Sequence, residues 1–189
     1  MIFVIEHLEK EMYNWCLIEY KHISDFVGKN NLLITNVKKK DISKLKNIAL
    51  TDSRSVLKLK LKKACLLDIK SKKTLLPNDS FDYFIFGGIL GDFPEQGRTE
   101  KYLTSKLKNV EIRNLLDKQM PTDNAVAVTK LIADGKDIND LKFKDNLIIN
   151  IKNGEFNEEL ELPFRYLLIN NKPFISSKLI NYLKKKKDI

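Results

Sequence analysis

The sequence feature that most constrains the fold is an apolar segment that ends in a cluster of glycines. Residues 81–86 are apolar except for Asp82, and Gly87, Gly88 and Gly91 follow them, although the whole chain has only seven glycines. A near-continuous apolar strand is typical of a parallel sheet that is covered on both faces. Glycine permits positive φ angles and close backbone approach. The segment therefore predicts a buried parallel strand followed by a loop that closely approaches another group.

Strand patterns and helix patterns alternate along the first 140 residues. Apolar runs predict strands at residues 2–6, 31–37, 64–69, 81–86 and 110–115. Helical patterns predict helices at residues 9–27, 42–50, 53–60 and 99–107, and a further helix with Thr122 as its N-cap and Gly135 at its end. This alternation favours a mainly parallel α/β sheet covered by helices.

The pattern changes after about Phe143. Short strands are expected at residues 147–151, 159–162 and 166–169, separated by Asn-Gly and Asn-Asn turns, which predicts a small antiparallel β appendage. A basic helix is expected at residues 176–187. We therefore divide the chain into an α/β domain, residues 1–140, and an appendage with its basic terminal helix, residues 141–189.

Composition sets limits on the class of protein. With 43% hydrophobic and 31% charged residues the chain reads as globular, and no apolar run approaches the roughly 20 residues of a membrane helix. Glu6 and His7 come too early for a signal peptide, so we expect a cytoplasmic protein that does not contact membranes. Cys16 and Cys65 stand apart among apolar neighbours, and the two histidines complete no metal-ligand spacing, so we expect no disulfide and no metal site.

The net charge of +9 favours an anionic partner such as RNA or a ribosomal surface. Lysines dominate the 34 basic residues, and their runs are also what solvated faces and fraying tails contain. Arginine occurs four times, and Arg98 and Arg113 lie in or beside the unusual segments. Arginine offers a planar, bidentate donor that lysine lacks. These two residues are therefore candidates for a carboxylate or a phosphate, or for loop-fixing ion pairs.

A second unusual segment, residues 113–123, also follows a predicted strand. It turns at Met120 and Pro121 and opens a helix at Thr122 and Asp123. We expect the ends of the two strands to lie beside one another, since ligands of open α/β sheets bind in crevices at such strand ends. The glycine loop lacks the lysine of a Walker A loop and the spacing of a dinucleotide fingerprint. For Thr122 and Asp123, simple helix capping is an alternative to ligand binding.

These residues resemble the SPOUT class of S-adenosylmethionine-dependent methyltransferases. The resemblance is to the branch that includes a protein arginine methyltransferase acting on a ribosomal protein, together with relatives predicted to be RNA methyltransferases. It is carried by residues 3–9, 15–24, 86–92, 98–99, 113–115, 118–120 and 122–123. It implies a deep trefoil knot formed by three successive strand-ending loops. Leu116 departs from the expected pattern, where a glycine should follow Arg-Asn-Leu, and Asp117 replaces a proline-like position.

The resemblance implies that the knot loops hold S-adenosylmethionine, mainly through backbone groups. Asp92 and Asp123 are the candidates for its polar or cationic parts. The implied cofactor residues are Phe86, Gly87, Gly88, Ile89, Leu90, Gly91, Asp92, Arg98, Leu115, Gln119, Met120, Thr122, Asp123 and Ala125.

Methyl transfer from a sulfonium needs alignment, exclusion of water and removal of a proton, and it needs no metal. For an arginine acceptor, carboxylates would orient the guanidinium and ease loss of its proton. We expect Glu6 and Glu19 in this catalytic role, although Glu19 fits a surface position as well. His22 is a further candidate base, or else a structural histidine.

We therefore expect a methyltransferase that uses S-adenosylmethionine and acts on a ribosomal protein arginine or on RNA, as a monomer or a homodimer. The alternative is a catalytically idle RNA- or ribosome-binding module with the same fold.

Overall fold

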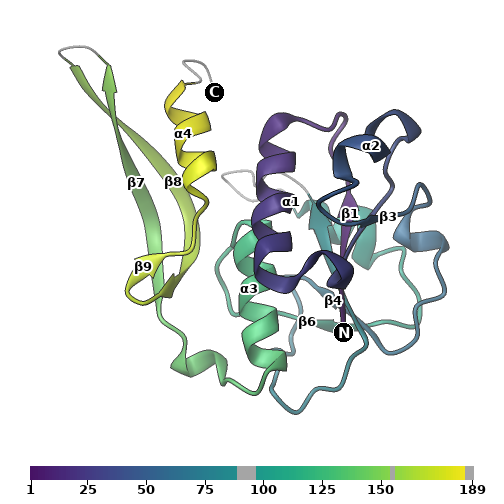
Figure 1. Ribbon diagram of the computed structural model, residues 1–189. Coiled ribbons are helices and arrows are strands. Elements are labelled where there is room, and N and C mark those ends of the chain that lie inside the picture. The colour runs from purple at the N-terminus through teal and green to yellow at the C-terminus, as the bar shows by residue number, and fades with distance from the viewer. Residues whose placement is uncertain (89–96, 154–155, 186–189) are drawn as a thin grey trace.

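The computed structural model describes residues 1–88, 97–153 and 156–185. It contains a six-stranded sheet and a separate three-stranded sheet (Figure 1). All pairings in the larger sheet are parallel, and those in the smaller sheet are antiparallel. The predicted α/β sheet with an antiparallel appendage is confirmed.

The larger sheet has the strand order β3-β2-β1-β5-β4-β6. Its strands are β1 (Ile2–His7), β2 (Leu32–Thr35), β3 (Leu50–Thr51), β4 (Ala64–Leu67), β5 (Tyr83–Gly88) and β6 (Glu111–Arg113). The helices are α1 (Asn14–Val27), α2 (Ile42–Leu45), α3 (Thr122–Ala133) and α4 (Ser177–Lys185). Shorter turns of helix are η1 (Lys29–Asn31), η2 (Lys39–Asp41), η3 (Val56–Lys58), η4 (Glu100–Thr104) and η5 (Ile138–Asp140).

Alternation along the central strands divides the core between the two faces of the sheet. Phe3 and Ile5 of β1 pack with Phe84 and Phe86 of β5 beneath α1 and α3. Val4, which lies between Phe3 and Ile5, faces the opposite side of the sheet and packs there with residues of η3 and η4. Successive side chains of a strand point to opposite faces, so an unbroken apolar run is required when both faces are covered.

Several helix predictions were too long. Residues 9–13 lie outside α1, and the helix expected at 42–50 is one turn, because Leu50 pairs with β2 as part of β3. Of the helix expected at residues 53–60, the structure has only the short turn η3. Within the helix expected at residues 99–107, residues 100–104 form η4. Short amphipathic patterns cannot separate a helix from a loop whose apolar residues are held by tertiary packing.

The expected neighbourhood of β5 and β6 is wrong. The strand β4 lies between them and pairs with both. The neighbours of β5 are β1 and β4, and Glu6 and His7 of β1 stand in register with Gly87 and Gly88. Strand order depends on which crossover passes over which strand, and residue patterns within a strand do not encode it.

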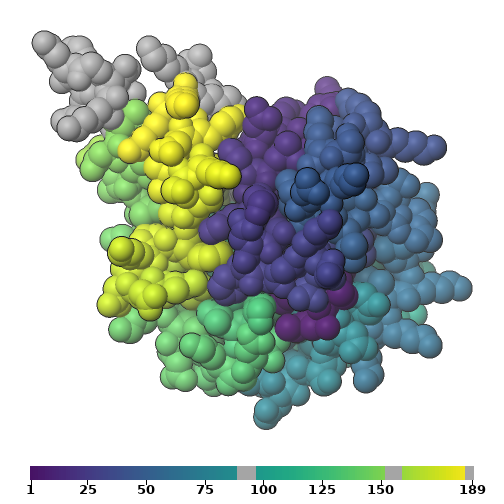
Figure 2. Space-filling model, viewed as in Figure 1, coloured from purple at the N-terminus to yellow at the C-terminus, as the bar shows by residue number. Residues whose placement is uncertain are grey.

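The appendage is a long hairpin rather than the three short strands expected. It contains β7 (Phe143–Asn153), β8 (Phe156–Ile169) and β9 (Lys172–Pro173). Figures 1 and 2 show α4 lying between this hairpin and α1, with the C-terminal segment packed along the side of α1. The smaller sheet begins just after η5, close to the predicted division at residue 140, and the division into two domains stays a prediction.

Within the described part of the chain, no helix combines the length and the apolar character needed to cross a bilayer.

Gly88 is required by packing at the end of β5. A Cβ atom at this position would lie 2.6 Å from Ile5 Cγ2, 2.8 Å from the Tyr20 hydroxyl oxygen and 3.1 Å from the Glu6 carbonyl oxygen. We expect Gly88→Ala to lower the free energy of unfolding by about 1–3 kcal/mol, because overpacking forces β1 or α1 to shift. Urea unfolding monitored by circular dichroism measures this, and an unchanged midpoint would contradict the close packing of β1, β5 and α1.

Candidate active site

The carboxyl ends of the parallel strands bring Glu6 next to the glycine segment. The Glu6 side chain is buried, and its Oε2 accepts hydrogen bonds from Thr35 Oγ1 at 2.5 Å and from the Val56 backbone N–H at 2.8 Å. These contacts connect the end of β1 to β2 and to η3. The structure thus places one predicted catalytic carboxylate beside the predicted cofactor residue Gly87.

Glu19 lies on α1 with its carboxyl group against the first turn of α3. Its Oε1 accepts the backbone N–H of Asp123 at 3.4 Å, and the backbone of Thr122 also contacts the carboxyl group. The first N–H groups of a helix have no partner inside the helix, and their partial positive charge favours an acceptor. The contact is therefore a helix cap supplied by a different helix, and Glu19 is buried rather than at the surface.

Burial is the main reason why the pKa of Glu19 is raised to about 8, and the neighbouring Asp123 carboxylate adds to the effect. The backbone N–H groups of Thr122 and Asp123 act in the opposite direction. A buried carboxyl beside a second carboxylate favours the neutral form, because burial removes the hydration of its charge and the like charges repel one another. Glu19 can therefore take up or release a proton near neutral pH.

Asp123 links this pair to His22 and to the next residue of α3. Its Oδ2 lies 2.8 Å from His22 Nδ1, and its Oδ1 accepts the backbone N–H of Asn124 at 2.8 Å. The His22 ring stacks on Phe174, with 4.2 Å between ring centroids. His22 thus has both a polar and an aromatic partner. Thr122 is the first helical residue and Pro121 the cap residue, so the N-cap prediction for Thr122 is wrong by one position.

The loop from β6 to α3 carries the other predicted cofactor residues. Leu115 is buried, and Met120 and Ala125 pack partly buried against the core. Leu116, where a glycine was expected, has a φ of 73°. Its backbone N–H bonds the side chain of Asn114 at 3.1 Å. The loop therefore keeps a glycine-like backbone conformation although a leucine occupies the position.

Three of the remaining predicted cofactor residues lie in the described part of the chain. Phe86 is buried in the core, and the Gln119 carbonyl oxygen accepts the backbone N–H of Arg165 at 2.9 Å. Arg98 lies partly exposed next to η4. Ile89, Leu90, Gly91 and Asp92 lie outside the described residues.

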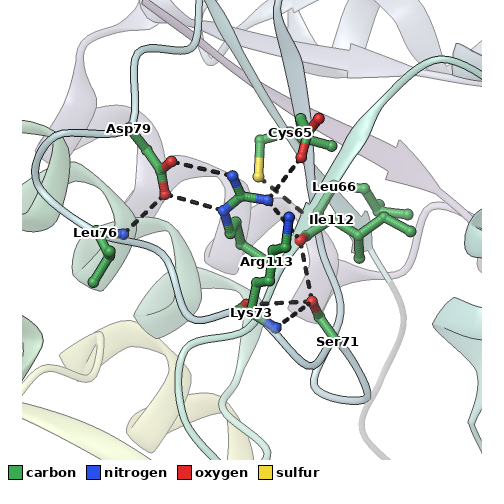
Figure 3. A network of polar contacts seen from close by, with 9 residues as sticks. Cys65, Leu66, Ser71, Lys73, Leu76, Asp79, Ile112 and Arg113 are labelled. Carbon is green, nitrogen blue, oxygen red and sulfur yellow. Dashed lines mark hydrogen bonds and ion pairs between the residues drawn. The ribbon is translucent and has the colours of Figure 1, made fainter.

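Arg113 forms a loop-fixing ion pair, which is one of the two roles predicted for it. Its Nε lies 3.0 Å from Asp79 Oδ2 and its Nη2 3.1 Å from Asp79 Oδ1 (Figure 3). The guanidinium also packs over the Phe81 ring. A third contact, to Glu111, further occupies the guanidinium. The Asp79 carboxylate is the main reason why the already high pKa of Arg113 is raised further, while burial acts in the opposite direction.

Sequence patterns missed three residues around the site. The Tyr20 hydroxyl group lies 2.8 Å from His7 Nδ1, directly beneath Gly88. Burial lowers the pKa of His7 and raises that of Tyr20. Asn124 is fully buried and bonds the Phe174 carbonyl oxygen and the Leu167 backbone N–H. A polar residue at a buried helical position was the one available signal for Asn124.

In residues 1–88, 97–153 and 156–185, no three His, Cys, Asp or Glu side chains come together in an arrangement that could hold a metal ion.

Comparisons with known proteins show likenesses that extend over nearly the whole chain. A profile of the family described as "Protein arginine N-methyltransferase SFM1-like" matches residues 2–189. The chain is 35% identical to the protein arginine N-methyltransferase SFM1 of Saccharomyces cerevisiae over 206 residues, which cover 98% of this chain and 95% of the relative. The crystal structure of yeast SFM1 complexed with SAM matches with a TM-score of 0.86 at 33% identity, covering 97% of this chain and 90% of that one.

A more distant likeness concerns the fold alone. The dual specific Trm10 of Thermococcus kodakaraensis matches with a TM-score of 0.55 at 15% identity, covering 73% of this chain and 95% of that one. Together these likenesses confirm the predicted SPOUT-like fold class, while the trefoil knot itself stays a prediction.

The raised pKa of Glu19 predicts a loss of stability with rising pH. The ordinary value is 4.5 and the folded value about 8, so the folded protein binds more protons than the unfolded chain between these limits. Stability from this group is fully present below pH 4.5 and is lost as the pH rises through 8. We expect the wild type to lose roughly 1–3 kcal/mol more than Glu19→Gln between pH 5 and pH 8. Urea unfolding at both pH values measures the difference, and parallel pH profiles would contradict the assigned environment of Glu19.

Proposed function

The chain belongs to the SFM1-like family of protein arginine N-methyltransferases, and from this premise we propose that it transfers the methyl group of S-adenosylmethionine to an arginine of a ribosomal protein. The observation that carries the chemistry is the buried carboxyl pair of Glu19 and Asp123. It lies at the start of α3, directly after the loop proposed to hold the methyl donor.

The residues around the strand ends fit S-adenosylmethionine. The buried Leu115 and the partly buried Met120 and Ala125 offer apolar surface, which an adenine ring requires. The buried carboxyl groups of Glu6 and Asp123 suit the positive charge of a sulfonium. When bound, the cofactor supplies an activated methyl group. We propose that the backbone of Gly87, Gly88 and Gln119 and the apolar side chains of the β6–α3 loop hold it.

Glu19 is the group we propose to receive the proton. An arginine nitrogen must give up a proton as it attacks a methyl group, and the guanidinium itself is a weak acid. A carboxyl with a pKa near 8 is a stronger base than an ordinary glutamate. Its neighbour Asp123 also suits a cationic acceptor, because an incoming guanidinium would bring a positive charge to two buried carboxyl groups.

Glu6 is the second carboxylate that we propose for orienting the acceptor. Its Oε2 already accepts two hydrogen bonds, from Thr35 and Val56, so a guanidinium would be contacted through Oε1. Those same contacts fix the carboxylate in place. A pre-oriented acceptor lowers the cost of aligning the substrate.

The basic charge of the chain supports a substrate on the ribosome. A net charge of +9 favours approach to an RNA-rich particle, and this holds for a protein acceptor embedded in that particle. The buried carboxyl groups favour a cationic arginine over a nucleotide as the group that is methylated. A ribosomal substrate also places the enzyme in the cytoplasm in this proposal.

Transfer of a labelled methyl group to ribosomes from the same source tests the proposal. We expect the label to survive nuclease and to be lost to protease. Glu19→Gln should lower the transfer rate at least ~100-fold, because removal of a general base typically costs two to four orders of magnitude. Its Kd for S-adenosylmethionine should stay within about threefold of the wild type, since the proton acceptor is not part of the proposed cofactor wall.

Asp25→Asn is the matched control, because Asp25 is an exposed carboxylate on the same helix and pairs only at the surface with Lys21. It should keep the wild-type rate. Label that is lost to nuclease would overturn the arginine acceptor, and a Glu19→Gln protein with full activity would overturn the role of Glu19.

A further inference from the structure

The geometry points to Arg165 as a positioning residue for the cofactor loop: its ion pair with Asp145 in the C-terminal sheet holds residues 115–121 in the shape that binds S-adenosylmethionine. This inference rests on the proposed function, because it takes that loop as a wall of the cofactor site. It gives the appendage a part in holding the methyl donor.

The contacts of Arg165 join the appendage to the loop from two sides. Its Nε lies 2.9 Å from Asp145 Oδ1 and its Nη2 3.3 Å from Asp145 Oδ2, while its Nη1 reaches Asp117 Oδ1 at 3.4 Å. Its backbone N–H bonds the Gln119 carbonyl oxygen at 2.9 Å. The partner of the ion pair also reaches the loop, since Asp145 Oδ2 accepts Lys118 Nζ at 2.7 Å. The two side chains of the ion pair thus contact loop residues 117 and 118, and the backbone of Arg165 contacts residue 119.

The ion pair is sheltered enough to act as a fixed support. The Arg165 side chain is 13% exposed and lies over the Phe143 ring at 5.4 Å. The guanidinium and Lys118 hold the pKa of Asp145 at about 2, so the pair stays charged at every physiological pH. A bidentate arginine–carboxylate contact is also directional, which a single exposed ion pair is not.

An irregularity in the hairpin places Asp145 opposite Arg165. The two residues pair directly, but the register shifts between Asp145 and Leu147, and Asn146 has a φ of 54°. A β-bulge bends a strand and redirects the side chains next to it. Here the bulge lies beside the pair that contacts the loop.

The loop needs such support because its backbone is strained. Leu116 has a φ of 73°, a conformation that costs a residue with a Cβ free energy relative to glycine. Strained conformations persist where the surroundings determine them more than once. The side chain of Asn114 holds the strained turn from within the loop, and the Arg165–Asp145 pair holds the following residues from outside.

Contacts continue from Arg165 along β8 to the start of α3. Leu167, two residues on, donates its backbone N–H to Asn124 Oδ1 at 2.8 Å. Between them, the buried Tyr166 lies close enough to Asp123 and Glu19 for these groups to add to the rise of its pKa. The strand β8 therefore runs beside the whole segment from Asp117 to Asn124, and Arg165 is its side-chain contact to the loop.

The test compares Arg165→Met, Arg165→Lys and the control Lys130→Met by titration with S-adenosylmethionine. Lys130 pairs with Asp134 at the far end of α3, so its loss removes an ion pair without touching the loop. We expect Arg165→Met to raise the Kd about tenfold, and Arg165→Lys to recover only part of that loss, because it keeps a charge for Asp145 but not the bidentate contact. Lys130→Met should bind as the wild type does. The KM for the acceptor should change less than twofold in all three.

The outcomes separate this inference from the proposed function. A wild-type protein that does not bind S-adenosylmethionine would overturn the proposed function, and the inference with it. A wild type that binds, together with an Arg165→Met protein of unchanged Kd, would overturn the inference alone, as would a change confined to the acceptor KM. If Arg165→Met does not fold, Asp145→Asn decides, because it keeps the size of the side chain and removes the charge. An unchanged Kd for that folded variant would equally overturn the inference.

Discussion

The carboxyl group of Glu19 lies against the first turn of α3, and the arrangement of the rest of the site depends on that contact. It joins α1 to α3 above the buried face of the sheet, and it brings Asp123 next to a second carboxyl group and to His22. Asn124, the next residue, connects the same turn to β8 and to Phe174 in the appendage. One helix turn is therefore the meeting point of the α/β domain, the proposed cofactor loop and the C-terminal sheet. Its buried polar groups are satisfied by one another, which makes the arrangement specific.

The first turn of α3 and the loop before it contain groups suited to both the cofactor and the acceptor. Apolar residues and backbone groups of the preceding loop suit a neutral adenosine, while the carboxyl pair behind it suits a cationic acceptor. Burial raises the pKa of Glu19, and that shift also reduces stability as the pH rises. Sites that need a base near neutral pH commonly carry such a cost. The strain at Leu116 is a second cost in the same region, and contacts from the appendage offset it.

Much of this arrangement could be predicted from the sequence, and the reasons are local. The apolar run at residues 81–86 identified a strand covered on both faces, and the change after Phe143 identified the appendage. Leu116 was marked as a departure from an expected glycine, and its φ of 73° lies in the left-handed region that favours glycine. The predictions that failed concern contacts between residues far apart in the chain. The position of β4 between β5 and β6, and the contact of Glu19 with Asp123, join residues far apart in the chain, and no periodicity records such pairings.

In the proposed site, the loop before α3, the first turn of that helix and the end of β5 bind the methyl donor together. Amide hydrogen exchange of the full chain, with and without S-adenosylmethionine, measures this directly. Binding should slow exchange in residues 84–88 and 115–125 and leave residues 147–151 of β7 unaffected. Slowing confined to the hairpin, or binding that leaves both of those segments unchanged, would contradict it.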